Sequence, residues 1–323
     1  MRYSRLLTVF ELGSLLVMLT LAGPAAAAEE AVCSDPNVFF CENWEDRALG
    51  NGDFTTNKGG KTLGWGVGDA STQSVVNSGC QDGGKCLQQT YPDLSTPQAK
   101  DNGGGGFIGT PSFPPTRTVY VRAWVKYPSN WVNSPNGSKW LFHENDQGYG
   151  PRTLTEHVGG LAWPALNQGY MENLGPNMNP SAQGQRLGQW QCVESKLTME
   201  STVGARDGSW EAWVNDPAGG PDIQVAQYFN IGPMASSSIT GQQRYYTDYL
   251  VSAYWNCQCD FARYQCNNNA TACIDPQNAH PLMQRLVDRI VVSRARIGCS
   301  GTASGTASGS SNPPSAPGQV QAK

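Results

Sequence analysis

The stretch VYVRAWVK, residues 119–126, alternates strictly between small aliphatic side chains and large aromatic or charged ones. Successive side chains of a β-strand point to opposite faces of a sheet, so this stretch predicts a strand with two different faces. One face is apolar and belongs in a core. The other face is mixed and carries Tyr120, Arg122, Trp124 and Lys126.

Other short runs along the chain have a similar character, and clusters of glycine, proline, asparagine and aspartate separate them. In residues 209–215, for example, Trp210 is expected in the core, and Glu211 and Trp213 on the outer face. Helical patterns are nearly absent, and no repeat period relates the runs. These features predict an all-β fold built as a two-sheet antiparallel β-sandwich.

The two ends of the chain differ from the middle. Residues 1–28 combine a short basic start, an apolar centre and a run of alanines, which predicts a secretory signal peptide and a secreted protein. Residues 300–323 consist mainly of glycine, serine, threonine, alanine and proline, which predicts a disordered tail. The β-sandwich domain is therefore expected to span residues 29–299.

Ten cysteines follow the predicted signal peptide, and an even number in a secreted chain indicates disulfides. Cys80 and Cys86 enclose a turn and are expected to pair, and Cys33 with Cys41 is a similar local pair. The group between Cys257 and Cys273 is also interpreted as disulfide-forming. A zinc site is the alternative for this group, but its spacing lacks paired Cys-x-x-Cys motifs.

The composition contains 22 lysine and arginine residues against 26 aspartate and glutamate residues. No basic stripe for nucleic acid and no membrane span are expected after the signal peptide. The 10 tryptophans favour stacking on sugar rings. A sheet face that mixes aromatic and charged side chains therefore predicts a saccharide-binding groove, and an ordinary solvated face is the alternative.

Residues 119–132, followed by residues 136–142, resemble secreted polysaccharide lyases with the concanavalin A-like jelly roll. Alginate and glucuronan lyases are the nearest in pattern, and heparinase-I-like proteins share the layout. Residues 188–194 with 207–214 are similar to a strand pair of that fold, and residues 288–293 to its closing strand. The likeness extends over residues 36–299, but Gly137-Ser138-Lys139 stands where the lyases have Gly-Gly-Lys.

This resemblance implies β-elimination on a polysaccharide, most naturally an acidic one with uronic acid sugars. Lys139 takes the position of the base, with His143 on the same strand face and Arg122 on a neighbouring strand to neutralise the substrate carboxylate. A tryptophan beside the lysine would lower its pKa by desolvation. The expected substrate-binding residues are Trp124, Tyr120, Asn145 and Trp213, and the candidate acids are Tyr120, Tyr170, Tyr245 and Tyr246.

Two other functions use the same features. A non-catalytic, lectin-like carbohydrate-binding module needs the sheet face but no base, and a glycoside hydrolase needs a pair of carboxylates. No cofactor is required for the elimination itself. In sandwiches of this kind, however, acids such as Glu42, Glu45 and Asp46 on the first strand and Asp288 on the last suit a structural calcium ion.

Overall fold

The computed structural model describes residues 32–50, 73–91, 113–132, 185–202, 205–231 and 281–299, together with the backbone of several further short strands. The predicted signal peptide, the predicted tail and the cysteines between Cys257 and Cys273 lie outside the described residues, as does Asn145.

Every named element is a β-strand, as the sequence predicts, and the described part contains no helix long and apolar enough to cross a membrane. The strands are β1 (Val38–Glu42), β2 (Asn57–Lys58), β3 (Lys61–Thr62), β4 (Gln73–Val76), β5 (Cys86–Tyr91), β6 (Phe107–Gly109), β7 (Thr118–Lys126), β8 (Ser138–Glu144), β9 (Leu154–Glu156), β10 (Pro164–Leu166), β11 (Trp190–Thr198), β12 (Gly208–Val214), β13 (Ile223–Ile231), β14 (Asp248–Trp255) and β15 (Met283–Ser293).

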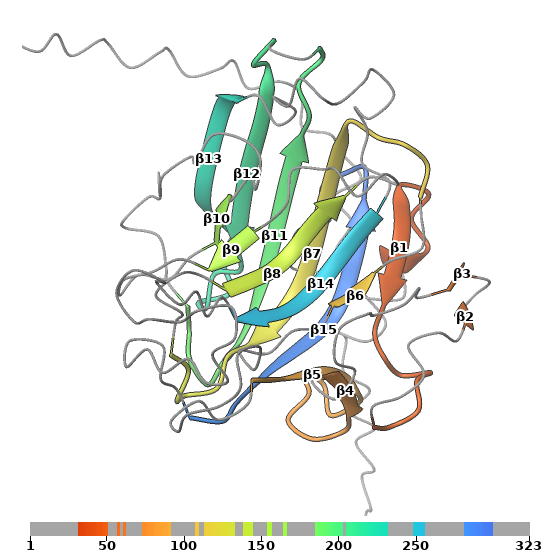
Figure 1. Ribbon diagram of the computed structural model, residues 1–323, viewed down its shortest axis with the longest axis vertical. Coiled ribbons are helices and arrows are strands. Elements are labelled where there is room, and N and C mark those ends of the chain that lie inside the picture. Colours follow the sequence, from red (N-terminus) through yellow and green to blue (C-terminus); the bar gives the residue numbers. More distant parts are fainter. Residues whose placement is uncertain are drawn as a thin grey trace, which may run out of the picture.

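The strands form two main antiparallel sheets (Figure 1). The larger sheet has eight strands in the order β13-β12-β11-β7-β15-β5-β4, with β1 paired to β15 beside this path. The smaller sheet has five strands in the order β10-β9-β8-β14-β6, and β2 with β3 forms a separate hairpin. Strand β7 therefore lies near the middle of the larger sheet, whereas β8, the next strand along the chain, belongs to the smaller one.

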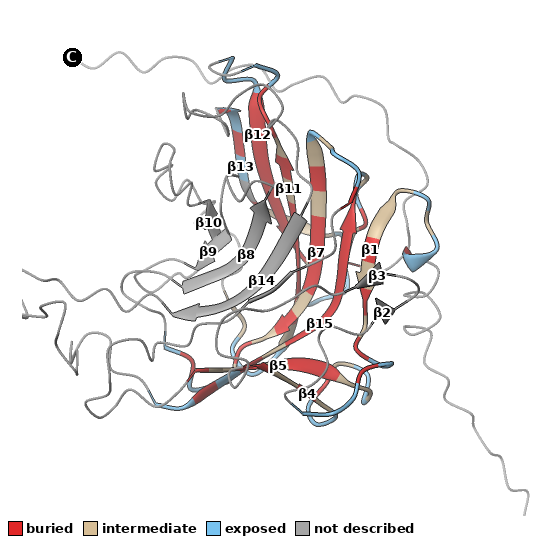
Figure 2. Cartoon of the chain, turned by 45° about the vertical axis from the view of Figure 1, so that its right-hand side comes forward, coloured by how far each residue is buried: buried red, intermediate tan, exposed pale blue. Residues whose placement is uncertain are grey.

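The alternation predicted for residues 119–126 is confirmed in β7. Val119, Val121, Ala123 and Val125 are fully buried and belong to the main hydrophobic core. Trp210 on β12 joins the same core, as its position in the strand predicts. Figure 2 shows how the buried positions continue along β7, β11 and β15. The core face of the larger sheet is thus set by the aliphatic half of each alternating strand.

Three disulfides connect described residues. The two local pairs expected from the sequence are confirmed: Cys33 bonds Cys41 with Cα atoms 5.6 Å apart, and Cys80 bonds Cys86 with Cα atoms 5.5 Å apart. The third disulfide joins Cys192 on β11 to Cys299, which is 107 residues away in the sequence. No local pattern identifies this third pair, because both partners are set by the packing of distant strands.

A buried ion pair lies at the end of β1. The Arg47 guanidinium donates to Glu42 Oε2 at 3.1 Å from Nε and at 2.8 Å from Nη2, and both side chains are buried. The other oxygen of Glu42 accepts the backbone N–H of Trp44, a buried residue with a positive φ of 66°. The carboxylate therefore holds the turn that follows the first strand.

Replacing Arg47 with methionine should destabilise the protein by about 3–5 kcal/mol, because Glu42 would keep a buried charge without its guanidinium partner. Urea unfolding measures this loss. The control is Arg294→Met: Arg294 is exposed and donates to Asn37, so its loss should stay below about 1 kcal/mol. Equal losses for the two variants would contradict the role of the buried pair.

Candidate functional site

The mixed face of β7 lies opposite the core, as the sequence predicts, but its arginine does not reach solvent. Arg122 has 0 % of its surface exposed, and Glu194 on β11 stands directly opposite it in the strand register. Glu194 is also 0 % exposed. Burial raises the pKa of this carboxyl group, whereas hydrogen bonds and the charges of two arginines lower it. This centre of the outer face is a buried polar cluster.

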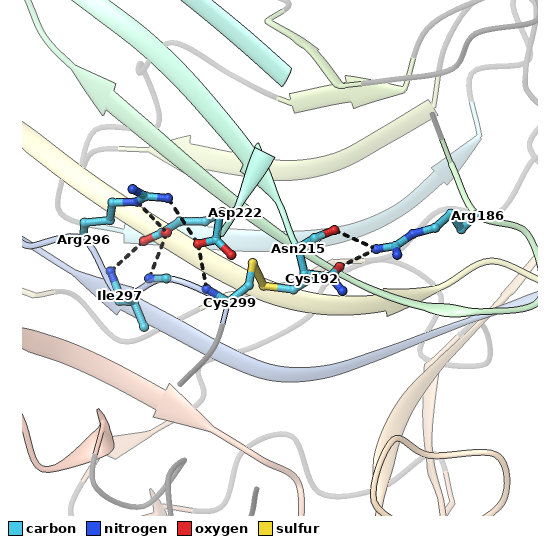
Figure 3. The surroundings of a disulfide bond; sticks show 9 residues. Arg186, Cys192, Asn215, Asp222, Arg296, Ile297 and Cys299 are labelled. Carbon is cyan, nitrogen blue, oxygen red and sulfur yellow. Dashed lines mark hydrogen bonds and ion pairs between the residues drawn. A yellow bond between two sulfur atoms is a disulfide. The ribbon is translucent and has the colours of Figure 1, made fainter. Parts of the chain in front are cut away.

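The segment after β15 covers this cluster. We call residues 294–299 the C-terminal strap (Figure 3). Glu194 accepts the backbone N–H groups of Ile297 at 2.7 Å and Gly298 at 3.0 Å, and Asp222 accepts that of Cys299 at 3.0 Å. The strap is bonded covalently to β11 through the disulfide with Cys192. The outer face is therefore occupied by the chain itself at this position.

Trp213, which the sequence suggests for sugar stacking, also lies under the strap. Its side chain is only 8 % exposed, and the Arg296 guanidinium lies 4.5 Å from the centre of its ring. The same guanidinium is 3.1 Å from Asp222 and 3.5 Å from Glu194. In this arrangement a cation from the protein takes the place on the ring where a sugar would stack.

Tyr120 lies farther along the same face, outside the strap. It stands opposite Lys196, which forms an ion pair with Glu211 at 2.6 Å. Burial raises the pKa of the Tyr120 hydroxyl above its ordinary value. The lysine, its carboxylate partner and the tyrosine form a compact polar cluster. Tyr120 belongs to the larger sheet, whereas Lys139 belongs to the smaller one.

Lys139 and His143 lie on β8, in the smaller sheet. The expectation that a neighbouring strand carries Arg122 is wrong, because β8 pairs with β9 and β14, whereas β7 pairs with β11 and β15. Arg122 and Trp124 therefore belong to one sheet and Lys139 and His143 to the other. The four residues do not form one site on a single sheet face.

The register of β8 against β14 brings other residues beside Lys139. Tyr254 stands directly opposite Lys139, and Tyr249 stands directly opposite His143. The sequence places a strand in this region but points to Tyr245 and Tyr246 as acids. These two, like Tyr170, lie outside the described residues. Finding Tyr249 and Tyr254 requires the pairing of two strands that are about 100 residues apart, which no local pattern contains.

The predicted calcium ligands are Glu42, Glu45, Asp46 and Asp288. Glu42 is engaged by Arg47 and Trp44 and does not fit. Asp288 is buried, and burial, with the nearby charges of Asp82 and Glu45, raises its pKa to about 8 although hydrogen bonding and the charge of Arg289 oppose the shift.

Gln81, which precedes Asp82, has a buried side-chain oxygen without a hydrogen-bond partner. Oxygen donors of this kind suit calcium, which would neutralise the carboxylates and link the turn after β1 to β15. No three acidic, histidine or cysteine side chains among the described residues are grouped as metal ligands, so structural calcium stays a prediction.

No protein-family model and no curated protein matches this chain. Among solved structures it is similar to the alginate lyase Aly36B, with a TM-score of 0.45, 14 % identity, and coverage of 80 % of this chain and 97 % of that chain. It is similar to the marine PL-14 alginate lyase from Aplysia kurodai, with a TM-score of 0.45, 10 % identity, and coverage of 69 % and 87 %. It is also similar to the cellulose induced protein Cip1, with a TM-score of 0.46, 16 % identity, and coverage of 80 % and 99 %. With TM-scores below 0.5 and identities of at most 16 %, these similarities assign no activity to this chain.

Calcium should raise the unfolding temperature by a few degrees, and the effect should grow as the pH rises from about 6 to about 9, because the ion competes with the proton on Asp288. Thermal unfolding in EDTA and in millimolar calcium chloride at each pH measures it. Asp288→Asn should lose the effect, and the control Asp216→Asn, in the turn after β12, should keep it. An equal calcium response in both variants would contradict the prediction.

Proposed function

We propose that this protein is a polysaccharide lyase that cleaves uronic-acid-containing polymers by β-elimination, with its active site on the β8–β14 face of the smaller sheet. The observation that carries the proposal is the register that sets Lys139 opposite Tyr254 and His143 opposite Tyr249. Residues directly opposite in an antiparallel pair share a face of the sheet. The register of this pair thus brings a lysine and a histidine level with two tyrosines, with a register shift between Val251 and Tyr254.

These residue types suit the three tasks of the elimination. The substrate carboxylate must be neutralised, the C5 proton must be removed, and the leaving glycosidic oxygen must receive a proton. In the proposed mechanism Lys139 removes the C5 proton in its neutral form, and Tyr254 donates a proton to the leaving oxygen. His143 and Tyr249 neutralise the substrate carboxylate by donating hydrogen bonds to it. No metal or organic cofactor takes part in this sequence of steps.

Arg122, Trp124, Tyr120 and Trp213 are not part of the proposed site. Arg122 is fully buried opposite Glu194, and Trp213 is covered by Arg296. A polymer would have to displace the C-terminal strap to reach either of them. Trp124 and Tyr120 share the β7 face with Arg122, in the larger sheet. The mixed face that suggests a groove in the sequence therefore serves the fold.

The fold that we propose for this site is a jelly roll of the concanavalin A-like kind, in which the two sheets pack face to face. The aliphatic face of β7 and its neighbours is fully buried, so another layer must cover it. Strand β14 of the smaller sheet approaches β5 of the larger one, and in Figure 1 β8 and β14 run across β7 and β15. In such a sandwich the free face of the smaller sheet would bind the polymer.

Secretion is part of the same proposal. Three disulfides in the described residues are typical of proteins that fold in an oxidising compartment. A polymer too large to enter a cell must be cleaved outside it. The proposed lyase would therefore act extracellularly after removal of the predicted signal peptide.

A lectin-like binding module is the second candidate. It is favoured by Ser138, which departs from the Gly-Gly-Lys segment of the lyases that the sequence resembles. Incubation with alginate, glucuronan or heparin separates the candidates. A lyase creates unsaturated ends that absorb near 235 nm, a binding module retains the polymer without cleaving it, and a hydrolase releases reducing ends without that absorbance. We expect the absorbance to rise with at least one polyuronide, and binding alone would overturn the lyase proposal.

On the polymer that is cleaved, Lys139→Ala and Tyr254→Phe should each lower kcat/KM by about 100-fold or more, because each removes a proton-transfer group. The matched controls are Lys126→Ala and Tyr120→Phe, which make the same chemical changes in the larger sheet and should stay within about threefold of the wild type. Circular dichroism checks that all four variants are folded. Unchanged turnover in Lys139→Ala would rule out the proposed base.

A further inference from the structure

Hydrogen bonds hold the C-terminal strap in addition to its disulfide with β11. Three consecutive backbone N–H groups, from Ile297 to Cys299, donate to the carboxylates of Glu194 and Asp222 at 2.7–3.0 Å. Gly298 has a positive φ of 76°, a conformation that lets neighbouring N–H groups converge on one anion. Glu194 is fully buried, so the two bonds that it accepts are shielded from water and correspondingly strong.

The side chain of Arg296 strengthens the same contact. Its guanidinium lies 3.1 Å from Asp222 (Figure 3) and 3.5 Å from Glu194. It also covers the ring of Trp213, with 4.5 Å to the ring centre. Glu194 lies on β11, and Asp222 is the residue directly before β13. The pairing of β11 with β12 and of β12 with β13 brings these two carboxylates together beside the strap.

The partner cysteine is also positioned by the strands. Cys192 lies two residues before Glu194 on β11, so the two residues share a face of the sheet. The side-chain oxygen of Asn215 accepts the backbone N–H of Cys192 at 2.9 Å, and Arg186 in turn donates to Asn215. The thiol of Cys192 is therefore fixed beside the place where the strap docks.

The sequence presents Cys299 with nearer partners than Cys192. Cys273 is 26 positions before Cys299 (299 minus 273), whereas Cys192 is 107 positions before it. If loop closure alone decided the pairing, the nearer cysteine would be favoured by roughly eightfold, because the cost of closing a flexible loop grows with its length. Cys257, Cys259 and Cys266 are nearer as well. The observed pair must therefore be selected by something other than proximity in the sequence.

We propose that Glu194 and Asp222 dock the C-terminal strap before Cys299 is oxidised, and that this docking selects Cys192 as its partner. With glutathione disulfide as the oxidant, the thiolate of Cys299 attacks one glutathione sulfur and releases a glutathione thiolate. The thiolate of Cys192 then attacks the sulfur of Cys299 in the mixed disulfide and releases the second glutathione. Two cysteine thiols are oxidised, one glutathione disulfide is reduced to two thiols, and the protons are taken up by the released glutathione.

Oxidative refolding of the full mature chain tests the selection. Reduced, denatured protein is refolded in glutathione buffer, free thiols are blocked, and the disulfides are mapped by mass spectrometry. The wild type and the control Glu211→Gln, which changes a glutamate on the same face that pairs with Lys196, should form mainly Cys192–Cys299. The double variant Glu194→Gln with Asp222→Asn should form it about tenfold less, with Cys299 bonded to residues 257–273 instead. Wild-type pairing in the double variant would overturn the proposal.

A second measurement does not depend on the folding of that double variant. In Cys192→Ala with Cys299→Ala the strap has no covalent link, yet the proposal requires it to dock. Hydrogen exchange at the amides of Ile297 and Gly298 should remain at least about tenfold slower than in an unstructured chain. Exchange at the unstructured rate in this otherwise folded variant would show that the strap docks only when the disulfide is present. That result would contradict the proposal. This outcome is independent of any lyase activity.

Discussion

Strand β7 is buried along its aliphatic face and, at Arg122, on its other face as well, and this constraint organises the rest of the described structure. Its aliphatic face belongs to the main core, and on its other face Arg122 is sealed opposite Glu194. Because a buried carboxylate must be satisfied, Glu194 binds backbone N–H groups of the C-terminal strap. Asp222 and the disulfide with Cys192 also contact the strap, at Cys299. The mixed face of β7 thus forms part of a buried joint, in which Arg122 lies opposite Glu194 and Glu194 binds the C-terminal strap.

This joint bears directly on where a polymer can bind. Two of the residues that suggest a saccharide groove in the sequence lie at this joint: Arg296 of the strap covers Trp213, and Arg122 stands opposite Glu194. To touch a substrate, Arg122 would have to leave this joint, and Glu194 would then keep a buried charge without the arginine opposite it. The proposed site therefore lies on the other sheet, where β8 and β14 bring two tyrosines level with Lys139 and His143. The burial pattern of β7 thus gives the larger sheet a structural role and leaves the smaller sheet for the proposed binding site.

The parts of the fold that depend on local alternation could be predicted from the sequence. The two faces of β7, the core position of Trp210 and the pairs Cys33–Cys41 and Cys80–Cys86 all follow from neighbours in the chain. The assignment of strands to sheets could not be predicted, because β7 and β8 follow one another along the chain and yet pair with different strands. The same is true of Cys192 with Cys299 and of Lys139 with Tyr254. Each of these pairs depends on register between distant strands, for which alternation alone allows several solutions.

The central claim is that Lys139 and Tyr254 act together on one face of the β8–β14 pair. A double-mutant cycle on kcat/KM for the cleaved polyuronide tests it most directly, using Lys139→Ala, Tyr254→Phe and the combined variant. Two groups that serve one transition state act as a unit, so the combined variant should be hardly slower than the worse of the two single variants. If the two losses instead multiply, the residues act independently, and the active site proposed on this face is wrong.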